Sequence, residues 1–150
     1  MAADILAAPM RLVALSLFVL TSLGAGCTAG TRSETPPGDD AVGPFADEAD
    51  YQRQREETAA ALEAAIEPAQ ASAVSACRVV PTSEQACGGP TSFAVYSAED
   101  PDAAEVARLA ARLVALDAQA NRQFEYVSTC MAYTPPTPAL RDGQCVSSRP

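Results

Sequence analysis

The sequence predicts a small α+β domain that is stapled by disulfides. Two segments place apolar residues at the three- and four-residue spacing of an amphipathic helix, and short β-type runs lie between and after them. Four cysteines, an even number, lie in the same part of the chain. We therefore expect a single domain over residues 47–150, in which two helices pack on a small antiparallel sheet.

The first helix is expected over residues 47–67. Asp47 is suited to cap its N-terminus, and the acidic residues Glu48 and Asp50 lie where the helix dipole is positive. Pro68 must end the helix, because proline lacks the N–H donor and clashes with the preceding turn. The segment is rich in alanine, so it buries little apolar area per residue.

A longer amphipathic helix is expected over residues 101–124, opened by Pro101 and Asp102. Its apolar residues step by three and four, and its polar residues fall mainly on the opposite face. The apolar positions are Val106, Leu109, Leu113, Leu116, Ala120 and Phe124. Such a stripe is typical of a helix that lies on a protein core.

Short β-type runs supply the strands of the predicted sheet. Two of them lie between the helices, at residues 78–80 and 93–96. Two more follow the second helix, at residues 131–133 and 144–146. A turn at residues 142–143, Asp-Gly, precedes the last run and is suited to a tight hairpin.

Residues 1–26 have the parts of a signal peptide. Arg11 supplies a short positive segment, and residues 12–23 form an apolar run without a charge. As a helix this run is about 18 Å long, short of the roughly 30 Å hydrocarbon core of a bilayer, which favours cleavage over a permanent membrane span. Met10 directly precedes Arg11, and we expect translation to begin there.

The end of this segment resembles the lipobox of bacterial lipoproteins. It reads Leu23-Gly24-Ala25-Gly26-Cys27, with Gly24 at the place where the pattern prefers leucine. The resemblance implies cleavage before Cys27, acylation of its thiol with palmitate-type chains, and anchoring in the cell envelope. Thr28 is not the Asp that marks inner-membrane retention, so the resemblance favours the outer membrane of a two-membrane cell. The alternative is an ordinary secretory signal.

Residues 27–46 are expected to form a lipidated cysteine and a disordered tether. The segment is rich in Pro, Gly, Ser, Thr and acidic residues, with almost nothing to bury. Phe45 is its one aromatic residue, and we expect it to be solvated. Such a tether would let a folded domain stand away from its lipid anchor.

Cys77, Cys87, Cys130 and Cys145 remain once Cys27 is assigned to lipid, and an even number in an exported chain predicts two disulfides. Three pairings are possible. Cys77–Cys87 and Cys130–Cys145 are favoured, because each half of the chain repeats a helix, a Ser-x-Cys, an apolar run, a proline and a second cysteine. A four-cysteine zinc site is the rival, but its ligands normally come in closely spaced pairs that are absent here.

The segment Cys87-Gly88-Gly89-Pro90, followed by a Phe-Ala-Val-Tyr-Ser strand, resembles an uncharacterised group of small exported bacterial proteins. These carry a CGGP segment, a long helix and four cysteines, and the resemblance covers residues 76–146. It implies a fold boundary and structural cysteines, but no activity. Gly88 and Gly89 permit positive φ, and Pro90 fixes the exit of the chain, so a structural corner is favoured over a binding loop.

The composition excludes most common enzyme designs. The chain has no His and no Lys, so it cannot form Ser-His or Cys-His pairs, imidazole metal sites or a Schiff base. Glu99, Asp100 and Asp102 could serve glycoside hydrolysis, yet acidic residues are expected at a helix N-terminus in any case. We therefore expect no enzyme activity, no cofactor and no metal.

The net charge is −9, and it stays −9 if residues 1–26 are removed, because one acid and one base leave together. An acidic chain without a basic cluster is not suited to bind nucleic acid. Anionic head groups would also repel it, so membrane contact must come from the lipid anchor.

These observations predict a non-catalytic binding or structural module of the cell envelope, with an envelope protein or glycan as partner. The alternative is an inhibitor of a secreted hydrolase. It would act through the Pro-rich loop 134–141, held rigid by its prolines and by a Cys130–Cys145 bridge, with Leu140 and Arg141 as contact residues. Rigidity before binding lowers the entropic cost of association.

Overall fold

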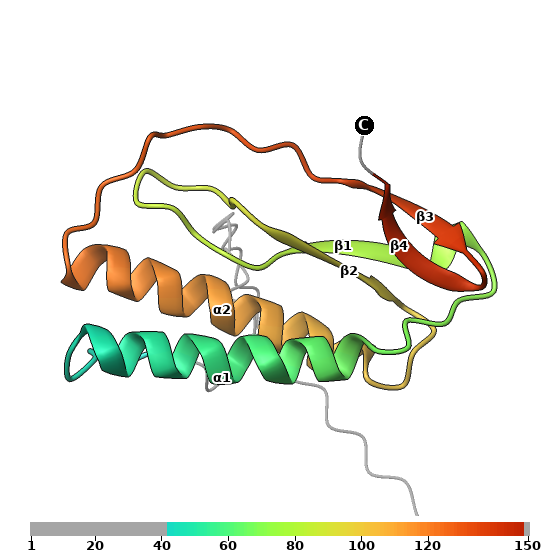
Figure 1. The fold of residues 1–150 in the computed structure, drawn as a ribbon, viewed down its shortest axis with the longest axis horizontal. Coiled ribbons are helices and arrows are strands. Elements are labelled where there is room, and N and C mark those ends of the chain that lie inside the picture. Colours follow the sequence, from blue (N-terminus) through green and yellow to red (C-terminus); the bar gives the residue numbers. More distant parts are fainter. Residues whose placement is uncertain (1–41, 149–150) are drawn as a thin grey trace, which may run out of the picture. The chain divides into compact units, whose positions relative to one another are not determined.

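The computed structural model describes residues 42–148. They form two long helices and two β-hairpins (Figure 1). In chain order the elements are α1 (Glu48–Ile66), a 3₁₀ turn (Val74–Ala76), β1 (Cys77–Pro81), β2 (Phe93–Ser97), α2 (Ala103–Gln123), β3 (Thr137–Arg141) and β4 (Gln144–Ser148). The predicted α+β class, with two helices packed together, is confirmed.

Helix α1 begins and ends as the sequence predicts. The Asp47 side chain accepts a hydrogen bond from the backbone N–H of Asp50 at 2.8 Å, and the Asp50 carboxylate accepts one from the N–H of Ala46 at 3.0 Å. The first bond satisfies a donor that a helix start otherwise leaves without a partner, and the second ties the preceding residue to the first turn. The helix ends at Ile66, because Glu67 precedes Pro68 and takes an extended backbone conformation.

Helix α2 carries the apolar stripe predicted for it, and this stripe forms the core. Val106, Leu109 and Leu113 are buried in one cluster together with Leu62 of α1. Leu116 and Ala120 continue the stripe into a second, aromatic cluster. The helix therefore joins two parts of the core along its length.

The first hairpin pairs β1 with β2 antiparallel, so that Val79 faces Val95 and Val80 faces Ala94. Because strand side chains alternate in direction, the hairpin has two faces, and each packs on a different part of the protein. Val80 and Ala94 pack on the helical core, whereas Val95 packs on the opposite side, near Cys77. In Figure 1 this hairpin lies between the helices and the second hairpin.

The second hairpin pairs β3 with β4 around the predicted turn at Asp142 and Gly143. Both turn residues have positive φ, 52° and 76°, which is the backbone of a type I′ turn and explains the Asp-Gly sequence. One expectation is corrected here. The strands form two two-stranded sheets instead of one sheet, and residues 131–133 belong to neither.

Phe45 is not solvated, contrary to the sequence-based expectation. Only 5% of its surface is exposed, and its ring lies 5.3 Å from that of Tyr51 and 6.2 Å from that of Phe124. Phe45 lies just before the N-cap Asp47, from where it closes over the first turn of α1 in the manner of a hydrophobic staple. The ordered structure therefore begins before residue 47.

The disulfides join Cys77 to Cys145 and Cys87 to Cys130, so the favoured pairing is corrected. The physical reason is the stacking of the two hairpins. Cys77 at the start of β1 faces Cys145 on β4, with Cα atoms 5.5 Å apart, and both side chains are buried there. Each bridge thus connects distant elements instead of closing a local loop.

Cys27, the leader over residues 1–26 and most of the tether over residues 27–46 lie outside the described residues. Within residues 42–148, no helix is both long enough and apolar enough to cross a membrane. The same part of the chain holds no cluster of three or more potential metal ligands.

Candidate binding surface

The residues predicted as inhibitor contacts lie on a hairpin and not on a free loop. Leu140 pairs with Cys145 and Arg141 pairs with Gln144. Only Thr134, Pro135 and Pro136 of the predicted loop 134–141 precede strand β3, which begins at Thr137. The loop is also not closed by a Cys130–Cys145 bridge, because Cys130 is bonded to Cys87. The predicted geometry of the inhibitory loop, a free loop closed by a Cys130–Cys145 bridge, is therefore wrong.

The segment just before this hairpin is the most exposed part of the described chain. We call residues Tyr126–Pro136 the strap. It has no helix or strand, and within the described residues its backbone makes no hydrogen bond to other backbone groups. Three of its apolar side chains are exposed: Val127 by 94%, Met131 by 56% and Tyr133 by 45%.

The strap is nevertheless held in place by loop 82–92, which joins β1 to β2. Cys87 is bonded to Cys130 in the middle of the strap, and the Cα atoms of the two residues are 5.6 Å apart. The Gln85 side chain donates a hydrogen bond to the carbonyl of Met131 at 2.8 Å. In Figure 1 the strap runs beside this loop. One covalent tie and one hydrogen bond thus position the middle of the strap against this loop, and the Tyr126 hydroxyl, which donates to Glu48 of α1, holds its first residue.

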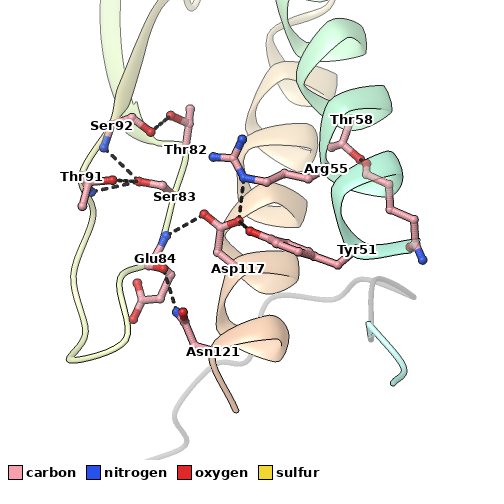
Figure 2. A network of polar contacts seen from close by, with 11 residues as sticks. Tyr51, Arg55, Thr58, Thr82, Ser83, Glu84, Thr91, Ser92, Asp117 and Asn121 are labelled. Carbon is pink, nitrogen blue, oxygen red and sulfur yellow. Dashed lines mark hydrogen bonds and ion pairs between the residues drawn. The ribbon is translucent and has the colours of Figure 1, made fainter. Parts of the chain in front are cut away.

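Loop 82–92 has its own internal supports. The Ser83 hydroxyl accepts hydrogen bonds from the backbone N–H groups of Thr91 and Ser92, both at 2.9 Å (Figure 2). Gly88 and Gly89 have φ of 88° and 85°, a conformation that other residues adopt only with strain. The predicted structural corner at CGGP is therefore present, and it also positions the strap.

The loop is fixed to the helices by Asp117, a residue of α2 with only 6% of its surface exposed. Its carboxylate accepts hydrogen bonds from the Tyr51 hydroxyl at 2.8 Å and from Arg55 Nε at 2.9 Å. It also accepts one from the backbone N–H of Glu84 at 3.1 Å (Figure 2). Burial, together with the bond to Asp117, raises the pKa of Tyr51. The three bonds satisfy a charge that would otherwise be costly to bury.

The strap carries no charged residue. The chain contains no charged residue from Tyr126 to Leu140, although the whole protein has a net charge of −9. A shallow cavity of about 230 Å³ lies between the strap and loop 82–92, lined by Gly88, Pro90 and Tyr133 among others. Another polypeptide could contact the middle of the strap without a charged side chain of the strap itself opposing it.

The acidic residues considered for glycoside hydrolysis are engaged in local hydrogen bonds. Glu99 accepts bonds from the hydroxyl and the backbone N–H of Ser72, at 2.6 and 2.7 Å, and these bonds lower its pKa. Asp100 accepts a bond from the N–H of Asp102 at 2.9 Å. These contacts order the segment that directly precedes helix α2.

The chain matches no protein-family model, no curated protein and no solved structure. Its two disulfides indicate an exported protein, because such bonds persist in oxidising compartments.

Sequence reasoning did not identify the strap or the role of Asp117. The strap could have been found from the uncharged stretch between Glu125 and Arg141, which stands out in an acidic chain. Asp117 carries no comparable signal, because an acidic residue on a long helix is normally exposed.

Proposed function

We propose that the protein is a non-catalytic binding module of the cell envelope, which is anchored by lipid on Cys27 and binds a partner polypeptide through the strap. One observation carries this proposal. The strap is an exposed, extended segment without charge, its backbone makes no hydrogen bond to other backbone groups of the described residues, and a disulfide holds it in position before any partner arrives. Preorganisation of this kind lowers the entropic cost of binding.

The mode of binding that fits best is the addition of a partner strand along the strap. A segment whose backbone N–H and C=O groups lack partners can pair with an extended peptide, and exposed side chains then provide specificity. Val127, Met131 and Tyr133 are such side chains. Pro135 and Pro136 cannot donate hydrogen bonds, so pairing would be confined to the part of the strap that precedes them.

The lipid anchor is supported by the likeness of residues 23–27 to a lipobox and by the charge of the protein. An acidic body is repelled by anionic head groups, so acyl chains, at about 0.8 kcal/mol per buried CH₂, must supply the membrane affinity. Thr28 favours the outer membrane in a two-membrane cell. Replacing Cys27 with serine should abolish metabolic labelling with palmitate, and continued labelling would refute the anchor.

Crosslinking in intact cells tests the binding surface. A photo-reactive residue at Tyr133 should give one discrete adduct with an envelope polypeptide, because this side chain lies on the strap. The same residue at Glu56, an exposed position on α1, is the matched control and should give none. The adduct should also disappear when Cys87 and Cys130 are both replaced with serine. Equal adducts at both positions, or none at Tyr133, would overturn the proposal.

Inhibition of a secreted hydrolase is a second candidate, favoured by the exposed, disulfide-held geometry of the strap. The inhibitory contact would then include Thr134–Pro136, between the bridge at Cys130 and strand β3. A panel of secreted proteases and muramidases should reveal stoichiometric inhibition that Tyr133→Ala reduces. Loss of inhibition in Arg141→Ala alone would place the contact on the β3–β4 hairpin. Absence of inhibition across the panel would reject this candidate.

A further inference from the structure

A second cavity, of about 330 Å³, lies on a different part of the molecule, between α1, α2 and the first hairpin. Its floor is apolar and belongs to the main core. Leu62 of α1 and Leu113 of α2 are buried there, and Phe93 and Ala94 of β2 form the opposite wall. The volume is at the lower end of the range for small-molecule sites, roughly 300–1,000 Å³.

The polar end of this cavity is formed by Arg55. Asp117 engages the guanidinium through Nε, at 2.9 Å, and the described residues provide no carboxylate for the two terminal nitrogens. In Figure 2 these terminal nitrogens point away from Asp117, toward the segment that carries Thr82. A guanidinium in this position presents two parallel donors, the geometry that suits a carboxylate.

Thr82 and Ser92 add a hydroxyl donor beside Arg55. Their hydroxyl oxygens are 2.8 Å apart, so one hydroxyl donates to the other. Whichever of the two donates, the proton of the second hydroxyl remains available to a ligand. Both residues line the cavity together with Arg55.

The other end of the cavity is acidic. Glu63 lies two helical turns after Arg55 on α1, about 12 Å along the helix axis. Its exposed carboxylate lines the mouth of the cavity. The site thus has a guanidinium with two terminal donors at one end, paired on its other side with Asp117, an apolar middle, and the Glu63 carboxylate at the other end, which disfavours a ligand with a second negative charge.

We infer that this cavity binds a small molecule with one carboxylate and an apolar body. The carboxylate pairs with the terminal nitrogens of Arg55 and accepts a hydrogen bond from the Thr82–Ser92 pair. The apolar body covers Leu62, Leu113 and Phe93.

Three probes of equal chain length test this inference by two-dimensional NMR of the disulfide-bonded domain. Hexanoate should shift the amide signals of Phe93 and Ala94 in a saturable manner. Hexanol, which lacks the charge, should bind about ten times more weakly, since a charge-assisted hydrogen bond contributes about 1.5–3 kcal/mol. Adipate, which has a second carboxylate, should also bind more weakly than hexanoate. Equal affinities for the three probes, or no saturable shift with hexanoate, would overturn the inference.

Two variants assign the roles of the charged residues. Arg55→Lys keeps the positive charge but loses the two parallel N–H donors of the guanidinium. It should weaken hexanoate binding about tenfold without affecting hexanol binding. Glu63→Gln, at an exposed position that does not bear on folding, should strengthen adipate binding about two- to tenfold. If Arg55→Lys does not fold, Thr82→Val removes one hydroxyl of the Thr82–Ser92 pair and should weaken the binding of hexanoate alone. Unchanged affinities in Glu63→Gln and in whichever of Arg55→Lys and Thr82→Val folds would contradict the assignment.

Discussion

At the scale of single residues, Asp117 is the point where three parts of the protein meet. Its carboxylate binds Tyr51 and Arg55 on α1, and the backbone of Glu84 in loop 82–92. Asn121, one turn further along α2, donates to the Glu84 carbonyl at 2.8 Å. Loop 82–92 in turn holds the strap. A buried carboxylate in the helical layer therefore contributes to the position of the proposed binding surface.

Replacement of Asp117 with asparagine should lower the free energy of unfolding by about 2–3 kcal/mol. The amide keeps the size of the side chain but loses charge-assisted bonds to partners that remain partly buried. Urea denaturation measures the effect. Glu105→Gln is the control, because Glu105 pairs with Arg108 on an exposed face of α2, and its urea midpoint should equal that of the wild type. Equal midpoints for both variants would refute the role of Asp117.

Tyr51 gives the protein an alkaline pH dependence. Its pKa is raised in the folded state, so above pH of about 10 the unfolded chain loses this proton first. The associated stability is complete below that pH and is lost as the pH rises. Tyr51→Phe should therefore lose less stability between pH 9 and 11 than the wild type does, as measured by urea denaturation at each pH. Identical losses would contradict the assignment.

At the scale of elements, the strap is unusual because it is long and has no secondary structure of its own. Connections of this length in small domains are typically either functional or disordered. Here the Cys87–Cys130 bridge and the Gln85 hydrogen bond order it without burying it. This combination leaves its backbone groups available for a partner.

Removing the two disulfides separately should have different consequences. With Cys87 and Cys130 replaced by serine, the backbone order parameters of the strap should fall while those of α2 stay high. Replacing Cys77 and Cys145 should leave the order of the strap unchanged and loosen the contact between the two hairpins instead. On the loop-entropy estimate either loss lowers the free energy of unfolding by about 4 kcal/mol, because the bridges span 68 and 43 residues. NMR relaxation of the backbone amides distinguishes the two patterns. Unchanged order parameters of the strap in the first variant would show that the bridge does not position it.

Features that depend on local physics were predicted correctly. Helix α2 follows from a periodic apolar stripe, the start of α1 from the cap at Asp47, and the turn of the second hairpin from Asp-Gly. Strand β3 was wrongly predicted to be part of the Pro-rich loop 134–141. Residues 131–133 have a β-type sequence, but none of the strands within residues 42–148 pairs with them. Phe45 was missed because the aromatic cluster that buries it is completed by Phe124, which is far away in the sequence, although its other partner, Tyr51, is local.

At the scale of the whole molecule, two long-range disulfides stabilise a domain whose apolar core is small. Helix α1 is rich in alanine and buries few large side chains. The Cys77–Cys145 bridge joins the two hairpins over a sequence separation of 68 residues, and Cys87–Cys130 joins loop 82–92 to the strap over 43. Sequence reasoning favoured local bridges because a repeated pattern shows spacing along the chain, but not the stacking of hairpins.

Mapping of the disulfides shows directly whether the strap is fixed to loop 82–92. The chain has no lysine, so trypsin cuts only after arginine and places each of the four cysteines in a separate peptide: 56–78, 79–108, 123–141 and 142–150. Under non-reducing conditions, mass spectrometry should find 56–78 linked to 142–150, and 79–108 linked to 123–141. Linkage of 56–78 to 79–108, and of 123–141 to 142–150, would show that no disulfide joins the strap to the loop.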